Sequence, residues 1–189
     1  MNEIITNMLE RRSYRKYEKK QIPDDLLNQI LEVALFAPNA GSGQRTKMLV
    51  CQNEEVNQTL GKFNKVAMPI RLGSKVNENQ PSIIDNPDIQ NAFYDAPTVI
   101  TFFALKNFLY SKEDSAFMAE NILLAAQSLG LGGCYVGRAK ETFNNEYGKK
   151  LMEEWELIDC DPIGHVILGY PIGVSYPKPR KEKRIKIIK

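Results

Sequence analysis

Four residues near the N-terminus carry donor groups of the kind that bind phosphate in proteins. Arg11, Arg12, Ser13 and Arg15 occur together in the segment RRSYR. In an extended segment alternate side chains point the same way, so Arg11, Ser13 and Arg15 would share one face. Guanidinium groups bind phosphate oxygens through paired hydrogen bonds, and a serine hydroxyl adds a short donor. Taken alone, the segment is better explained as a solvated basic edge at the end of a helix.

A second candidate segment is the loop PNAGSGQ, residues 38–44. Its small residues let backbone amides approach a flat ligand closely, and Asn39, Ser42 and Gln44 supply polar groups. The loop precedes a predicted strand and lacks GxGxxG spacing, so it is not a dinucleotide-binding fingerprint. Taken alone, it is better explained as an ordinary turn from a helix to a strand.

The sulfur and imidazole groups of the chain do not form a recognisable reactive set. Cys51, Cys134 and Cys160 are an odd number and lack CxxC spacing, so we predict reduced thiols and no zinc knuckle. Cys134 follows two glycines and is interpreted as a small apolar filler. His165, the only histidine, has no Cys or carboxylate at metal-ligand spacing. We therefore expect no metal site, and we assign neither Cys134 nor His165 a catalytic role.

The composition is that of an ordinary globular protein. The 189 residues include 25 Lys and Arg against 23 Asp and Glu, which leaves a formal charge of +2. This length predicts one domain over residues 1–189, slightly above the usual size of about 100–150 residues. A nucleic-acid-binding protein would carry a larger basic excess, and a membrane span needs roughly 18 consecutive apolar residues. We therefore expect no nucleic-acid partner, no membrane association and a cytoplasmic location.

Hydrophobic periodicity and capping signals predict an alternation of helices and strands. The predicted helices cover residues 2–11, the stretch from Pro23 to Pro38, and residues 54–61, 112–129 and 139–154. Ser111 and Asp114 resemble a capping box at the start of the longest helix. The predicted strands are residues 46–52, 96–105, 132–137 and 165–171. Among them, 96–105 is rich in β-branched and aromatic residues, which predicts an interior strand.

Three further segments bear on assembly and on access to a site. The apolar residues of helix 112–129 cover much of its circumference, so a chain of this size needs a partner subunit to surround it, and we infer a homodimer. Residues 62–94 are polar and contain prolines, which predicts a long excursion that could form a lid. The basic tail, residues 171–189, could contact nucleic acid or a membrane, but its isoleucines favour an arm packed on a partner subunit.

The order of five segments resembles the FMN-dependent nitroreductase family. These segments are RRSYRKY, ALFAPNAGSGQ, DAPTVITFFAL, AENILLAAQSLGLGGCYVG, and ILGYP followed by PKPR. The likeness extends over roughly residues 4–180, with 62–94 as its main gap. It implies an α+β fold with a central mixed, mostly antiparallel β-sheet flanked by helices, and an intertwined homodimer that holds FMN at the subunit interface.

The resemblance also implies which residues contact FMN. The phosphate-binding cluster of the family corresponds to Arg11, Arg12, Ser13 and Arg15, joined by Lys178 and Arg180 of the tail. Because an FMN phosphate carries close to two negative charges, cations from both chain ends favour the phosphate interpretation of RRSYR. The ring-contacting loop corresponds to Pro38, Asn39, Ala40, Ser42 and Gln44, expected to reach the flavin of the other subunit. The glycine-rich segment corresponds to Tyr135, Val136 and Gly137, where a backbone amide would face flavin N5.

Two departures from the family pattern concern the ligands. Family members commonly read P-S-x-x-N-x-Q-P-W in the first loop, whereas this chain has Asn39, Ser42, Arg45 and Thr46 at the corresponding places. Arg138 follows Gly137 where an acidic or small residue is often found. A cation at that place would favour an anionic substrate.

The resemblance implies an FMN-dependent oxidoreductase in which NAD(P)H reduces the flavin by hydride transfer. A second substrate, such as a nitro compound or a quinone, is then reduced in a ping-pong cycle. One alternative is a specialised family member for reductive dehalogenation or ene reduction, with residues 62–94 as a substrate lid. Another is a flavin-binding or redox-sensing protein with little turnover.

Overall fold

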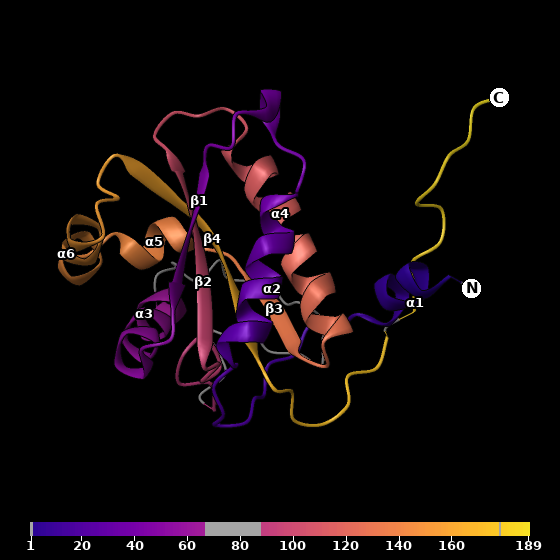
Figure 1. The fold of residues 1–189 in the computed structure, drawn as a ribbon, viewed down its shortest axis with the longest axis horizontal. Coiled ribbons are helices and arrows are strands. Elements are labelled where there is room, and N and C mark those ends of the chain that lie inside the picture. Colours follow the sequence, from indigo (N-terminus) through magenta and orange to yellow (C-terminus); the bar gives the residue numbers. More distant parts are fainter. Residues whose placement is uncertain (1, 67–87, 178) are drawn as a thin grey trace.

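The fold is built on a four-stranded sheet, which the computed structural model of the chain shows in Figure 1. The structure describes residues 2–66, 88–177 and 179–189. The strands are β1 (Thr46–Cys51), β2 (Thr98–Leu105), β3 (Gly132–Val136) and β4 (Cys160–Gly169), in the spatial order β1-β2-β4-β3. All neighbouring strands in this sheet are antiparallel. Within the described residues, the only parallel pairing is an isolated bridge between Ser13 and Gly133.

Helices cover both faces of the sheet (Figure 1). One face carries α2 (Asp24–Leu35) and α4 (Ser111–Ser128), and the other carries α3 (Glu54–Val66), α5 (Ala139–Phe143) and α6 (Glu146–Glu154). Strand β2 is buried from Thr98 to Ala104, which confirms the prediction of an interior strand. The α+β class and the antiparallel sheet flanked by helices agree with the predicted fold. None of the helices in the described ranges is long and apolar enough to cross a membrane.

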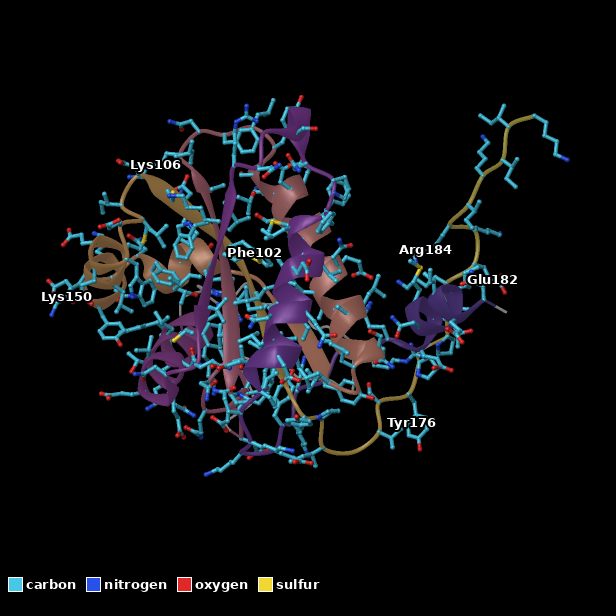
Figure 2. All side chains as sticks on the ribbon, viewed as in Figure 1. Phe102, Lys106, Lys150, Tyr176, Glu182 and Arg184 are labelled. Atoms are coloured by element: carbon cyan, nitrogen blue, oxygen red, sulfur yellow. The ribbon has the colours of Figure 1, made fainter. Side chains whose placement is uncertain are left out.

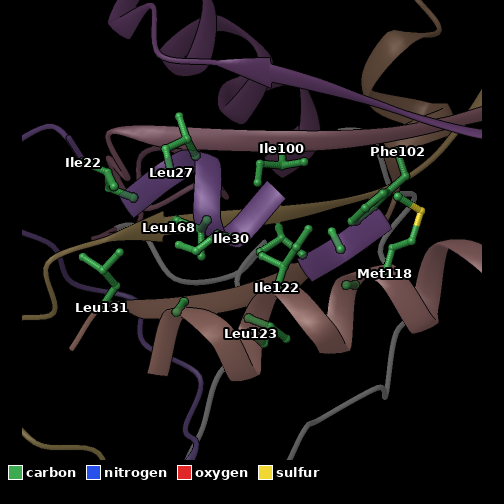
Figure 3. Close-up of a cluster of buried hydrophobic side chains, with 14 of the residues drawn as sticks. Ile22, Leu27, Ile30, Ile100, Phe102, Met118, Ile122, Leu123, Leu131 and Leu168 are labelled. Carbon is green, nitrogen blue, oxygen red and sulfur yellow. The ribbon is translucent and has the colours of Figure 1, made fainter. Parts of the chain in front are cut away.

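The larger core cluster lies between the sheet and the pair of α2 and α4 (Figure 3). Ile100 and Phe102 of β2 are fully buried there because alternate residues of a strand face the same layer. Ile30 of α2 and Ile122 of α4 are also fully buried and fill the space above them. Helix α4 packs on all four strands, so this core fixes the position of α4 against the whole sheet.

The two chain ends leave the body on the same side of the molecule (Figure 1). Helix α1 (Glu3–Glu10) buries none of its residues, and Ile4 and Leu9 are 65% and 59% exposed. Asn7 Nδ2 attaches α1 to the body by donating a hydrogen bond to the Leu124 carbonyl at 2.9 Å. In the tail, Tyr176 and Arg184 lie outside the body (Figure 2). A single chain therefore leaves the apolar side of α1 uncovered.

Several element boundaries differ from the sequence prediction. Helix α3 continues to Val66, and β4 begins at Cys160 rather than at residue 165. The predicted helix 139–154 is two helices, because the Asn145 side chain accepts a hydrogen bond from Gly148 N and starts α6 anew. The predicted capping box is wrong: α4 has no side-chain cap, and Asp114 Oδ1 instead accepts a hydrogen bond from Ala40 N at 2.9 Å.

The predicted excursion, residues 62–94, is in part built into the body. Residues 62–66 complete α3, and Asn91, Ala92 and Phe93 are buried. The Ala92 amide donates to the Gly61 carbonyl at 2.9 Å, which ties this segment to α3. Residues 67–87, on which the rest of the predicted lid falls, lie outside the described residues.

Candidate functional site

The RRSYR segment lies along the outer edge of β3. Ser13 pairs with Gly133, and the Tyr14 amide donates to the Gly133 carbonyl at 3.1 Å. Beside it, Tyr17 pairs with Pro171, the first residue of the tail. The two ends of the chain therefore meet at this edge, as expected if both contribute to one site. Beyond Gly133, the outer edge of β3 has no strand partner among the described residues.

Three of the four predicted phosphate ligands gather around Cys134. Burial raises the pKa of the Cys134 thiol, while the Arg15 charge, a hydrogen bond with Ser13 and the Arg11 charge act in the opposite direction. Arg11, Ser13 and Arg15 thus all act on one group of β3, as expected if alternate residues of an extended segment share a face. Cys134 itself is only 2% exposed, which agrees with its interpretation as a filler.

The Arg12 side chain contacts the end of α1 instead. Its Nη1 donates to the carbonyls of Leu9 and Arg11, both at 2.7 Å, so the guanidinium caps the last turn of α1. The Nε atoms of Arg11 and Arg12 are buried, and neither has a hydrogen-bond partner in the described part of the chain. Arg11 Nε does lie 3.5 Å from Glu120 Oε1, an ionic contact to α4. The Arg11 Nε–H, whose guanidinium charge acts on Cys134 of β3, leaves donor capacity that a bound phosphate would use.

A cavity of about 540 Å³ lies where β3 ends against α4. This volume is in the range of about 300–1,000 Å³ that is usual for small-molecule sites. Apolar side chains of α4 and β4 line it, together with Tyr135 and Gly137 from the predicted flavin-facing segment. The charged residues of its lining are Lys112, Glu120 and Arg138.

A buried hydrogen-bond network fixes the turn that leaves β3. Asn64 Nδ2 donates to the Gly137 carbonyl and to Thr142 Oγ1, both at 2.8 Å. Thr142 Oγ1 in turn donates to the Arg138 carbonyl at 2.7 Å. Asn64 and Thr142 are fully buried. Sequence reasoning missed both residues, because neither lies in a motif and only the packing of α3 on α5 brings them to the turn.

Tyr94 is a second residue that the sequence did not reveal. Its ring lies 5.9 Å from the Arg15 guanidinium carbon, a cation–π contact. Burial raises the pKa of Tyr94, and the charges of Arg15 and Arg138 counteract this effect. Tyr94 thus lies close to both a predicted phosphate ligand and the residue after Gly137. Tyr94 and Asp95 also adopt positive φ angles of 54° and 57°, a backbone strain typical of functional sites.

The predicted ring-contacting loop lies elsewhere in the same chain. Residues Ala40–Ser42 form a short 3₁₀ turn held to α4 through Asp114. The Asn39 side chain accepts a hydrogen bond from Gln44 N at 2.9 Å, and Ser42 and Gln44 have positive φ angles. No residue of 38–44 lines the cavity beside β3. Within one chain, the loop of residues 38–44 therefore does not reach the cavity beside β3. The sequence prediction assigned this loop to the flavin of the other subunit.

The tail ligands and the histidine complete the predicted set. Arg180 is exposed, and Lys178 lies outside the described residues. His165 is fully buried; its Nδ1 lies 2.8 Å from Thr101 Oγ1, and burial lowers its pKa to about 3. Its imidazole is therefore neutral near pH 7, as suits a structural residue. The guanidinium donors and the open backbone edge of β3 beyond Gly133 fit an FMN phosphate and ring, and the adjoining cavity is space that a substrate would enter.

Comparisons with known proteins identify the family of the chain. The chain is 30% identical to the NADPH-flavin oxidoreductase of Vibrio harveyi, over 98% of this chain and 71% of the relative. It is 23% identical to the FMN reductase (NAD(P)H) of Bacillus subtilis, over 95% of this chain and 70% of the relative. A crystal structure of a nitroreductase with bound FMN from Bacteroides fragilis superposes with a TM-score of 0.83, at 25% identity and full coverage of both chains. The model of the Nitroreductase family matches residues 8–170, most of the chain, and the chain belongs to that family.

Proposed function

We propose that this chain is an FMN-dependent NAD(P)H oxidoreductase and that FMN lies along the outer edge of β3. The observation that carries this proposal is that Arg11, Ser13 and Arg15 all act on Cys134 of β3, a strand whose outer edge beyond Gly133 has no strand partner among the described residues. The named activities of the Vibrio harveyi and Bacillus subtilis relatives support it, as does the FMN in the Bacteroides fragilis structure. Bound FMN would supply hydride acceptance from NAD(P)H and electron delivery to a second substrate.

In this proposal, the residues of the chain bind FMN and orient it. Arg11 and Arg15 place guanidinium donors around a phosphate, and Ser13 adds a hydroxyl at the same point. The backbone of Tyr135 to Gly137 presents amides along the open edge of β3, and Asn64 holds the Gly137 carbonyl so that this edge keeps its direction. A ligand seated on the apolar floor from α4 would displace water from that floor and so strengthen the polar contacts beside it.

A second copy of the chain completes this site in our proposal. The uncovered apolar side of α1 and the tail isoleucines Ile185, Ile187 and Ile188, each at least 76% exposed, offer surface for a partner subunit. The loop of residues 38–44 would then reach the flavin of that partner. The acceptor, whether a nitro compound, a quinone or another oxidant, and the cytoplasmic location remain predictions.

The purified protein is expected to be a yellow homodimer with about one FMN per chain. The physical reason is that α1 and the tail leave large apolar side chains exposed, and contiguous exposed apolar surface marks interaction sites. Light scattering after size exclusion gives the mass, and the absorbance of released flavin gives the stoichiometry. A monomer that stays colourless after incubation with FMN would contradict both the cofactor and the assembly.

Turnover is expected to follow ping-pong kinetics. The described residues form one cavity beside β3 and no Gly-rich dinucleotide loop, so NAD(P)H and the acceptor would use the same space in turn. Anaerobic NAD(P)H should bleach the yellow colour without acceptor, and added acceptor should restore it. Double-reciprocal lines at several fixed acceptor concentrations should be parallel. Converging lines would refute the shared cavity, and no bleaching by NADH or NADPH would indicate a flavin-binding protein with little turnover.

A further inference from the structure

The cavity beside β3 has an excess of positive charge. Lys112 and Arg138 line it, and neither forms an ion pair within 4.0 Å in the part of the chain that the structure describes. Glu120 is the only acidic residue among its described lining, and that carboxylate faces Arg11. A ligand in this cavity therefore meets two cations that form no close ion pair within the described residues, and Glu141 acts on the Arg138 charge only from beyond ion-pair distance.

Arg138 is held toward this cavity by a strained backbone. Its φ angle is +65°, in the left-handed region where a side chain costs roughly 1 kcal/mol or more. Its carbonyl accepts hydrogen bonds from both the amide and the hydroxyl of Thr142, at 2.9 and 2.7 Å. Asn64 fixes the preceding carbonyl. A glycine would adopt this conformation more easily, and strained positions of this kind are concentrated at functional sites.

The remaining lining defines the rest of the ligand. Ala116, Ala119, Leu123 and Ile163 form an apolar floor, and Tyr135 adds a ring. Arg138 is partly buried, so water screens its charge less than at an open surface. A flat apolar body would bury itself against this floor, and an anionic group at its end would meet Arg138 and Lys112.

We propose that the second substrate is an anionic aromatic or conjugated compound whose carboxylate binds Arg138. This inference rests on the proposed function and adds its substrate class. For a nitroaromatic carboxylate, NAD(P)H would supply a hydride and solvent a proton. The nitro group would lose one oxygen as water and become nitroso, with NAD(P)⁺ as the other product. Arg138 acts here as a specificity-determining residue, because the carboxylate itself does not react.

The test compares 4-nitrobenzoate with its neutral amide, 4-nitrobenzamide, as acceptors. Arg138→Gln is expected to lower kcat/KM for 4-nitrobenzoate about ten- to a hundredfold, the usual worth of a charge-assisted hydrogen bond, and to leave the amide within about twofold. Arg138→Lys should restore part of the loss because it keeps the charge without the planar fork. Lys150→Gln is the matched control: it removes one positive charge from α6, away from the cavity (Figure 2).

A binding measurement makes the inference independent of turnover. In calorimetric titrations of the flavin-loaded protein, benzoate should bind more tightly than benzamide, and Arg138→Gln should abolish the difference. Equal losses for both acceptors, or a loss of bound flavin, would overturn the inference and assign Arg138 to the cofactor. If neither nitro compound is reduced, a quinone acceptor tests the proposed function separately, and no NAD(P)H oxidation with the quinone either would refute that function. The comparison of benzoate with benzamide decides in each case whether the cavity selects anions.

Discussion

Replacing Arg15 by alanine is expected to weaken FMN binding about ten- to a hundredfold and to leave the affinity for riboflavin nearly unchanged. The two ligands differ only in the phosphate, so the comparison isolates a phosphate contact. Arg15 lies with Arg11 and Ser13 around Cys134, and its guanidinium rests against the ring of Tyr94 at 5.9 Å. Fluorescence titration of the flavin-free protein with each ligand measures both dissociation constants.

Lys16→Ala is the matched control for Arg15. Lys16 is the next residue along the same segment, is exposed, and carries the same charge, but alternation points its side chain to the other side. Its removal should change both affinities by less than about threefold, the scale of an exposed charge. Equal losses of FMN and riboflavin in Arg15→Ala would show that Arg15 acts on the ring or on the fold, and would remove it from the phosphate cluster.

Replacing Phe102 by alanine is expected to lower the free energy of unfolding by about 3–5 kcal/mol. Phe102 is fully buried in β2 between the sheet and the helices α2 and α4 (Figure 3). The residue also lies at the irregularity in the pairing of β2 with β4, between Phe102 and Phe103. Removing the ring leaves a cavity that neighbouring strands cannot close without shifting this register. Urea unfolding at one fixed protein and FMN concentration measures the loss.

Phe36→Ala is the control for the core substitution. Phe36 is 81% exposed at the end of α2, so the same change in chemistry should cost less than about 1 kcal/mol there. A loss in Phe102→Ala no larger than in Phe36→Ala would mean that the core between β2 and α4 is not the main source of stability. An unchanged urea dependence of the unfolding free energy shows that the two variants unfold from equally compact states.

Local signals in the sequence were sufficient for most of the architecture. The β-branched and aromatic run around Ile100 and Phe102 predicted the buried β2, and the apolar circumference of 112–129 predicted a helix in contact with much of the fold. These predictions succeed because burial and periodicity are properties of a few neighbouring residues. The predicted helix boundaries were wrong where a side-chain contact interrupted the helix. At Asn145, the side chain accepts a hydrogen bond from Gly148 N and starts a new helix.

The sequence also predicted part of the candidate site. The order of its segments identified the family, and the spacing of Arg11, Ser13 and Arg15 predicted their common face. It could not show that Arg12 turns back to cap α1, because a guanidinium beside a helix end has two partners available and only the folded geometry chooses between them.

Only the tertiary structure brought Asn64, Tyr94 and Thr142 to the site. These residues come from α3, from the segment before β2 and from α5, and they meet because one face of the sheet gathers chain segments far apart in sequence. The sequence also did not predict the left-handed backbone at Arg138, because arginine has no local preference for a positive φ angle. The sequence by itself determined which elements form and which charges they carry. Long-range packing decided which of those charges face a common cavity, because the hydrogen bonds that fix the turn cross between elements and form only when those elements are already in place.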